Sequence, residues 1–116
     1  MSKFSREYQR KVTGKLGMAW VQNGVKFDGM IDGILIEVKG RYSQFINKKT
    51  GKFYGWFKKG EQSFVNQAVR QLDASEGAKI QWYFAEKETM ELVKEVLMNA
   101  RINGIERIEF IFQPFK

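Results

Sequence analysis

Residues 27–40 read FDGMIDGILIEVKG, an apolar segment interrupted by two aspartates, a glutamate and a lysine. Asp32-Gly33 is the kind of dipeptide that forms a two-residue hairpin turn between antiparallel strands. With that pair at the tip, Asp28 stands directly opposite Glu37, with about 5 Å between the two β-carbons. The segment therefore predicts a hairpin that brings two carboxylates together.

The two faces of this hairpin differ, because successive side chains of a strand point to opposite sides. The face expected to meet the core carries Phe27, Gly29, Ile31, Ile34, Ile36 and Val38. The other face carries Asp28, Glu37 and Lys39, with Lys26 opposite Lys39. Facing carboxylates repel each other, and a divalent cation such as Mg²⁺ or Mn²⁺ turns the repulsion into attraction. The alternative is a solvent-facing polar surface on which the two lysines neutralise the two acids.

The composition restricts the chemistry that is available. The chain has 116 residues, of which 43% are hydrophobic, and this fits one domain over residues 1–116. It contains no cysteine and no histidine, which excludes disulfides, thiolate metal sites and the commonest general base. The charged start predicts no signal peptide, and no apolar run approaches the length of a membrane span. A soluble protein is expected, with catalysis by Asp, Glu, Lys, Arg, Tyr or an oxygen-held metal.

The net charge of +7 is concentrated in one segment. Between residues 39 and 60 there are seven cations and no acids, and the rest of the chain has 13 of each. Aromatic residues alternate with these cations: Tyr42, Phe45, Phe53, Tyr54, Trp56 and Phe57. Cations bind phosphates and aromatic rings stack on unpaired bases, so the pattern favours nucleic acid. The alternative is a solvated basic loop whose aromatic residues fold a hairpin against the domain. Both are expected to be partly true, with Phe57 packed and the lysines exposed.

Periodicity and turn dipeptides predict the element order α-β-β-β-α-β-α-β. The expected helices cover residues 3–13, 61–76 and 87–103, and the expected strands cover residues 18–22, 25–31, 34–40, 80–85 and 105–113. A small hairpin is expected around Thr50-Gly51. Strand 80–85 follows a helical crossover, which predicts that it runs parallel to strand 34–40. The fold class is α/β (α+β), a mixed central sheet with helices on both faces.

An Asp on one strand followed by Glu-x-Lys on the next resembles the restriction-endonuclease-like, or PD-(D/E)xK, nuclease fold. More narrowly, the chain resembles the restriction-endonuclease-fold toxin domains of bacterial polymorphic toxins, in particular their fifth-numbered family. The segments that carry this resemblance are YQRKVTG, VKFDGMIDGILIEVKGRY, GWF, QAVRQ and IQWYFAE. The resemblance as a whole runs from about residue 7 to residue 107, nearly the whole chain.

The resemblance implies a Mg²⁺-dependent (or Mn²⁺-dependent) endonuclease that acts on DNA as the toxin domain of an antibacterial effector. The implied metal ligands are Asp28, Glu37 and the carbonyl of Val38. Lys39 would orient the attacking water or stabilise the developing charge. Because the chain has no His or Cys, a metal-activated water is the expected nucleophile.

The resemblance also adds helical residues to the site. Members of the superfamily present a glutamine from the helix after the Glu-x-Lys strand, and here Gln67 is favoured over Gln71. Glu7, on the first helix, is a candidate for an extra metal ligand or for support of one. The expected nucleic-acid-binding residues are Arg41, Lys48, Lys49, Lys52, Trp56, Lys58, Lys59, Arg70 and Gln71. Ordinary surface positions remain the alternative for the two glutamines and for Glu7.

Two other functions stay open at this point. One is a catalytically silent module of the same fold that binds nucleic acid or a protein partner. The other is an RNA nuclease, which the sequence does not separate from a DNA nuclease. A delivered toxin would act in the cytoplasm of a target bacterium, and an acidic immunity protein is a further expected partner of the basic segment.

Overall fold

The computed structural model describes residues 3–14 and 19–115. The elements are α1 (Lys3–Thr13), β1 (Trp20–Gln22), β2 (Val25–Phe27), β3 (Gly29–Ile31), β4 (Ile34–Lys39), β5 (Ile46–Asn47), β6 (Lys52–Phe53), α2 (Lys58–Ala74), β7 (Ile80–Phe84), α3 (Lys87–Asn99) and β8 (Ile108–Phe112). Between α1 and α2 the chain forms strands β1 to β6, after which strands and helices alternate, and short 3-10 turns lie at Ser43–Phe45, Gly55–Phe57 and Ile105–Arg107.

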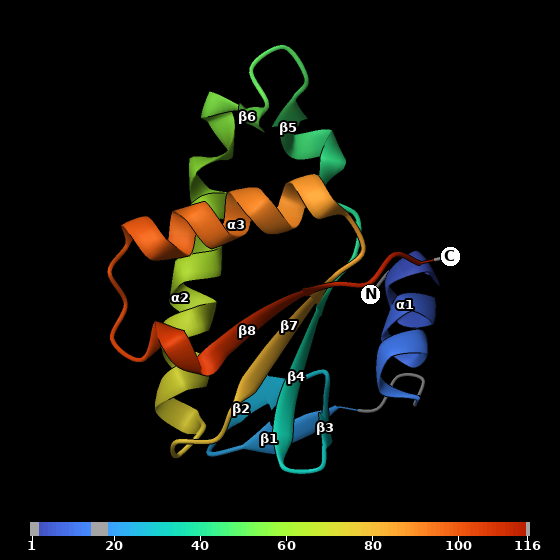
Figure 1. The fold of residues 1–116 in the computed structure, drawn as a ribbon, viewed down its shortest axis with the longest axis vertical. Helices are drawn as coiled ribbons and strands as arrows, with labels where there is room; N and C mark the ends of the chain where they lie inside the picture. The colour runs from blue at the N-terminus through green and yellow to red at the C-terminus, as the bar shows by residue number, and fades with distance from the viewer. Residues whose placement is uncertain (1–2, 15–18, 116) are drawn as a thin grey trace.

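A mixed four-stranded sheet forms the centre, in the order β3-β4-β7-β8 (Figure 1). β3 and β4 pair antiparallel, whereas β4, β7 and β8 are parallel to one another. The parallel pairs follow from the connections, since α2 and α3 are the crossovers that a parallel neighbour requires. The predicted α+β class and the predicted direction of strand 80–85 are therefore confirmed.

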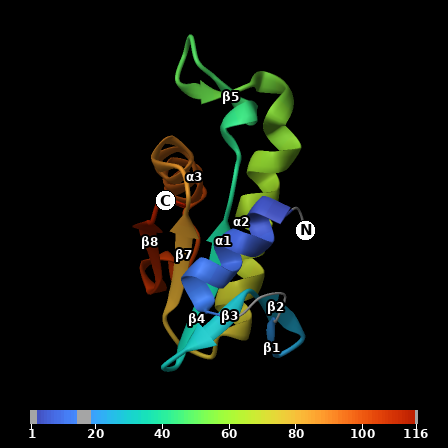
Figure 2. The ribbon, with the colours of Figure 1, turned by 90° about the vertical axis from the view of Figure 1, so that its right-hand side faces the viewer.

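Helices cover both faces of the sheet. α1 lies across one face, and α2 and α3 lie on the other (Figure 2). The main core fills the space beneath α2 and α3, where Leu35 of β4 and Trp82 and Phe84 of β7 are almost fully buried. Both faces of β4 are covered, because Leu35 and its neighbour Ile36 are each 1% exposed. Within the described residues no helix is long and apolar enough to cross a membrane.

The hairpin between β3 and β4 has the predicted turn. Gly29 pairs with Ile36, and the pairing continues to the residues that flank the turn. Asp32 and Gly33 have φ angles of 52° and 80°, the positive values that the favoured two-residue hairpin turn requires. Gly29 also lets α1 approach closely, since a β-carbon there would lie 2.9 Å from Thr13 Cγ2.

The predicted pairing of Asp28 with Glu37 and of Phe27 with Val38 is wrong. The ladder ends at Gly29, the chain bends at Asp28, and β2 pairs with β1 in a separate two-stranded sheet. The predicted faces change with it, because Phe27 joins Leu35 in the main core. The face that carries Glu37 is covered by α2 and is not open to solvent.

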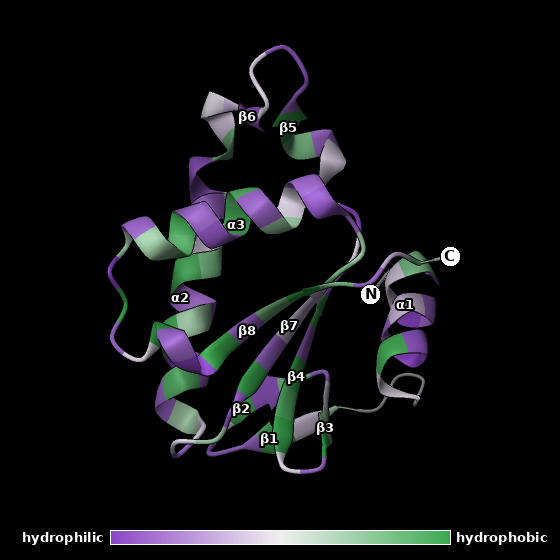
Figure 3. Ribbon diagram, viewed as in Figure 1, coloured by the Kyte–Doolittle hydropathy of each residue, from purple (hydrophilic) through white to green (hydrophobic). Residues whose placement is uncertain are grey.

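The basic segment folds as the small hairpin β5–β6, held by stacked aromatic rings. The rings of Phe45 and Phe57 stack with centroids 4.3 Å apart, and Phe53 lies 5.0 Å from Phe57. The intervening turn is hydrophilic (Figure 3). α2 begins at Lys58, earlier than predicted, and passes through Gly60, where a β-carbon would lie 2.2 Å from the Phe57 ring.

Other element bounds also differ from the predicted ones. α3 ends at Asn99, because the chain turns before the left-handed Gly104. The first residues of the predicted strand 105–113 form a 3-10 turn, and β8 is shorter. Met18, at the start of the predicted strand 18–22, lies outside the described residues, and β1 begins at Trp20.

Candidate active site

Asp28 occupies the bend between β2 and β3. Its backbone N–H donates to the carbonyl of Ile36 at 2.8 Å, and its Oδ2 accepts the backbone N–H of Val38, also at 2.8 Å. The carboxylate thus takes the place of the missing strand partner of Val38. The N–H and C=O of one strand residue point to the same side, so the Val38 carbonyl also faces the Asp28 side of β4.

Glu37 is buried among hydrogen-bond donors. Gln67 Nε2 donates to its Oε2 at 2.9 Å, and Gln71 Nε2 donates to its Oε1 at 3.0 Å. The Lys39 ammonium lies 3.1 Å from Oε2. Because an ionised carboxylate only accepts hydrogen bonds, three donors stabilise its charged form. The burial of this charge is therefore compensated by its neighbours.

Lys39 is fixed by polar and aromatic partners at once. Its Nζ donates to Gln67 Oε1 as well as contacting Glu37. The same atom lies 4.9 Å from the centre of the Trp82 ring and 5.5 Å from that of Phe64. Cations are attracted to aromatic faces in this range. An ammonium group has three donors, so two are used and one is left for a further oxygen atom.

The Asp28 carboxyl is the strained member of the pair. Burial, and then the nearby Glu37 carboxylate, raise the pKa of Asp28 to about 7, although the Val38 N–H and Lys39 act in the opposite direction. The ionised form of Asp28 is thus unfavourable near neutral pH unless a positive charge joins the two acids.

A cavity of about 390 Å³ opens beside the two acids. Asp28 and Glu37 line it together with Gln67, and the cations Lys26 and Arg70 lie along its wall. The cavity therefore combines carboxylate oxygens with positive groups, an arrangement suited to a metal ion and a phosphate.

The described part of the chain contains no cluster of three or more His, Cys, Asp or Glu side chains that could hold a metal ion.

The model of the restriction endonuclease fold toxin 5 family matches residues 5–87. The chain belongs to this family. The matched region of this toxin-5 family member runs from α1 to the first residue of α3 and includes Asp28, Glu37 and Lys39. Family membership indicates a nuclease toxin. A comparison with curated proteins gives no match.

α1 contributes a different residue from the one expected. Glu7 is exposed on α1 and does not line the cavity of the two acids, so we do not place it in the site. Gln9 is buried instead, and its Nε2 donates to the backbone carbonyl of Asp28 at 2.9 Å. Gln9 borders the apolar stripe of α1, next to Tyr8, and this position was the signal in the sequence that Gln9 would be buried.

The two glutamines of α2 have different positions. Gln67 is half-buried between Glu37 and Lys39. Gln71 was expected to contact nucleic acid but is fully buried, with its Oε1 accepting the Trp82 N–H at 2.8 Å. Since an indole only donates, this bond turns the Gln71 NH₂ group toward Glu37. Gln71 therefore positions the carboxylate.

The basic hairpin lies away from the two acids. Figures 1 and 2 show it at one end of the molecule, beyond the first turn of α2. The lysines of the hairpin and of the start of α2, which follows it, are exposed, as expected: Lys48, Lys49, Lys52, Lys58 and Lys59. Trp56 is 67% exposed, and the exposed Arg41 lies over the Phe4 ring at 4.0 Å. The hairpin and the acid cavity are thus separate surfaces of one molecule whose longest dimension is 40 Å.

The raised pKa of Asp28 predicts a pH-dependent stability in EDTA. An unfolded Asp has a pKa of about 3.9. As the pH rises, the Asp28 carboxyl therefore loses its proton near pH 4 in the unfolded state but only near pH 7 in the folded state. The stability of the folded state then falls as the pH rises, and the loss is complete above the folded pKa. We expect the melting temperature of the Asp28→Asn variant to exceed that of the wild type by several degrees at pH 8. At pH 4 the difference should shrink, and parallel profiles would contradict the raised pKa.

Proposed function

We propose that the protein is a metal-dependent endonuclease that hydrolyses phosphodiester bonds of DNA, as the toxin domain of an antibacterial effector. The observation that carries the proposal is the buried constellation of Asp28, Glu37 and Lys39 in a member of a nuclease-fold toxin family. Two acids and a lysine at one cavity match the chemistry of phosphodiester hydrolysis, which needs charge stabilisation and an activated water.

The donor set fits a hard divalent cation. Asp28, Glu37 and the Val38 carbonyl would supply oxygen ligands, which Mg²⁺ and Mn²⁺ prefer. Glu37 Oε2 already has two partners and Oε1 has one, so Oε1 is the oxygen with a lone pair left for a cation. The raised pKa of Asp28 fits as well, because a cation would favour its ionised form. When bound, such an ion polarises a phosphate oxygen and lowers the pKa of a coordinated water.

Lys39 and the glutamines have separate tasks in this proposal. The remaining N–H of Lys39 donates to the attacking water or to the developing negative charge on the phosphate. Gln67 holds the Lys39 ammonium and the Glu37 carboxylate together, since its amide contacts both. Gln71 fixes the other Glu37 oxygen. Lys26 and Arg70, on the cavity wall, neutralise the phosphate that enters.

The exposed cations of the basic hairpin would hold the flanking DNA. At 3.4 Å per base pair, a duplex of about 12 base pairs is as long as the molecule, whose longest dimension is 40 Å. One duplex could therefore reach both the hairpin and the acid cavity. In this proposal Trp56 adds an exposed aromatic ring to the DNA contacts and Arg41 adds a cation. The same positive surface would suit an acidic immunity protein.

Removal of hairpin charge tests this part of the proposal. The test variant replaces Lys48, Lys49 and Lys59 by Gln, and the control replaces the exposed Lys79, Lys87 and Lys94, so that both lose three charges. We expect the hairpin variant to lower DNA affinity and to reduce the log–log salt slope by about 0.9 for each lost phosphate contact. Its rate at saturating DNA should stay near the wild-type rate, because these lysines bind ground and transition states alike. Equal log–log salt slopes in the two variants would mean that the hairpin lysines are solvated and do not contact DNA phosphates.

Two competing functions predict different results with purified protein. A silent binding module would bind DNA but leave it intact with Mg²⁺ or Mn²⁺. An RNA nuclease would cleave RNA and spare DNA under the same conditions. Parallel incubations with DNA and RNA therefore separate the three proposals. For a delivered toxin, the site of action would be the cytoplasm of a target bacterium.

A further inference from the structure

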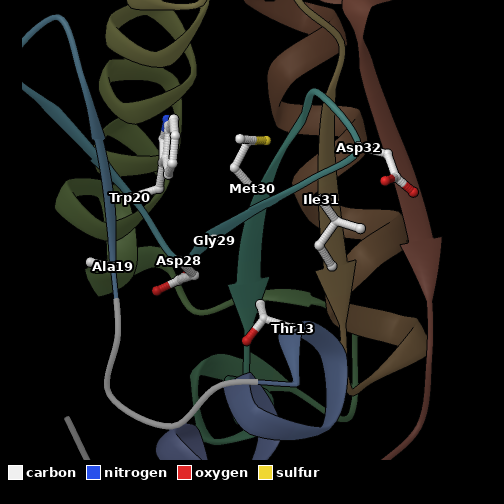
Figure 4. A pocket seen from close by; sticks show the side chains of 8 residues that line it. All are labelled: Thr13, Ala19, Trp20, Asp28, Gly29, Met30, Ile31 and Asp32. Carbon is white, nitrogen blue, oxygen red and sulfur yellow. The ribbon is translucent and has the colours of Figure 1, made fainter.

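A second cavity, of about 510 Å³, lies along the outer strand of the sheet and reaches Asp28 from another side. Figure 4 shows its lining, which comes from the end of α1, the start of β1, and β3 with its turn. Trp20, Met30 and Ile31 are its large apolar members, and Asp28 and Asp32 are its acidic ones. The nuclease chemistry described above uses only Asp28 of this set.

Trp20 offers an aromatic surface that is fixed in place. The residue is 40% exposed, and its indole N–H donates to Gln22 Oε1 at 3.3 Å. The Gln22 amide in turn donates to the carbonyls of Ala74 and Ser75, each at 3.1 Å, at the end of α2. The polar edge of the indole is thus satisfied, and the ring remains available for contact with a planar ligand.

The two cavities differ in charge, because the Trp20 cavity has acids alone, whereas the cavity beside Glu37 has both acids and cations in its described lining. The described lining of the Trp20 cavity includes Asp28 and Asp32 and no cation, which disfavours a phosphate. Carboxylates accept hydrogen bonds from the amino groups of nucleobases, and aromatic rings stack on bases of any sequence. The neighbouring cavity contains Lys26 and Arg70, which favour a phosphate. Asp28 lies in the lining of both cavities.

We propose that the Trp20 cavity receives an unstacked nucleobase of the nucleotide chain whose phosphate is bound beside Asp28 and Glu37. The assignment rests on the proposed nuclease function and specifies its substrate as DNA with unpaired bases at the cut site. A fully paired duplex keeps its bases stacked, so it must open locally before a base can enter. Single-stranded DNA, flaps and mismatches avoid that cost and are the preferred substrates.

The test measures binding, so that it does not depend on cleavage. A single-stranded oligonucleotide and the same backbone without bases are titrated against the protein with Mg²⁺, in a Lys39→Met background that slows cleavage by about 100-fold. Trp20→Ala is expected to weaken binding of the base-containing strand about ten-fold, and Trp20→Phe to retain most of it. Val21→Ala is the matched control, because Val21 is the next residue of β1, is 65% exposed and is not part of the cavity. Binding of the base-free strand should be the same with and without Trp20.

Fluorescence gives a second measurement on a chain that keeps Trp20. In a Trp56→Phe background the remaining tryptophans are Trp20 and the fully buried Trp82. The base-containing strand should quench the fluorescence and the base-free strand should not. Equal quenching by both strands, or an equal loss of binding to both in Trp20→Ala, would overturn the assignment. A protein without nuclease activity that still shows base-dependent quenching would refute the proposed function and support the base cavity.

Discussion

Replacement of Asp28 by Asn should reduce metal-dependent DNA cleavage by at least about 1,000-fold. Asn keeps an oxygen that can accept the Val38 N–H, so the bend between β2 and β3 can persist. It removes the negative charge that the proposed cation needs beside Glu37. Burial and the nearby Glu37 carboxylate disfavour the ionised form of Asp28. Replacement of this carboxyl should therefore also raise the melting temperature in EDTA. Lower activity together with higher stability is the signature of a functional acid.

A matched substitution shows whether the effect belongs to the site. Asp73→Asn removes a carboxylate from the exposed side of α2 and should leave cleavage and melting temperature nearly unchanged. Glu37→Gln is a less clean test, because an NH₂ group would face the three donors that now surround the carboxylate. Circular dichroism confirms that each variant is folded. Wild-type cleavage by a folded Asp28→Asn variant would remove Asp28 from the proposed mechanism.

Replacement of Lys39 by Met should lower the rate at saturating DNA by about 100-fold, with a small change in KM. Met has an unbranched side chain that can pack against Phe64 and Trp82, where the lysine now lies. It cannot donate a hydrogen bond to the water or to the phosphate. Arg should not restore the rate, because its planar fork differs from the compact ammonium group.

Single-turnover kinetics measures this effect apart from DNA binding. Lys94→Met is the control, since Lys94 is exposed on α3, and its rate should equal that of the wild type. The role assigned to Lys39 fails if its Met variant keeps the wild-type rate while remaining folded. A loss confined to KM would instead make Lys39 a residue of ground-state binding.

The sequence was most informative where local chemistry determines the geometry. The Asp32-Gly33 turn specified the register from Gly29 to the tip, because that turn demands positive φ at both residues. The helical crossover before residues 80–85 predicted a strand parallel to β4, and β7 does run parallel to it. The prediction that the Asp and the Glu-x-Lys meet at one place was also close to the structure, since Asp28 and Glu37 line one cavity.

Non-local packing accounts for the features that sequence reasoning missed. The bend at Asp28 depends on β2 leaving the sheet to pair with β1, and strand periodicity contains no signal for such a departure. Likewise, the sequence pattern indicated that Gln71 lies on the helix surface. In the structure Gln71 is buried, and the indole N–H of Trp82, from a strand distant in sequence, donates to its side-chain oxygen. The distance between the basic hairpin and the acids arises because α2 begins beyond the end of β4. Adjacency in the chain therefore did not mean adjacency in space.

The central claim is that Asp28 and Glu37 hold a divalent cation for phosphodiester hydrolysis, and cleavage of DNA by the purified wild-type protein tests it most directly. Supercoiled plasmid and single-stranded DNA are incubated with Mg²⁺, with Mn²⁺ or with EDTA, with Asp28→Asn protein as the blank. We predict cleavage with either metal ion, none in EDTA, and recovery when Mg²⁺ is added back in excess of the chelator. Intact DNA under all conditions, or equal cleavage in EDTA, would contradict the claim.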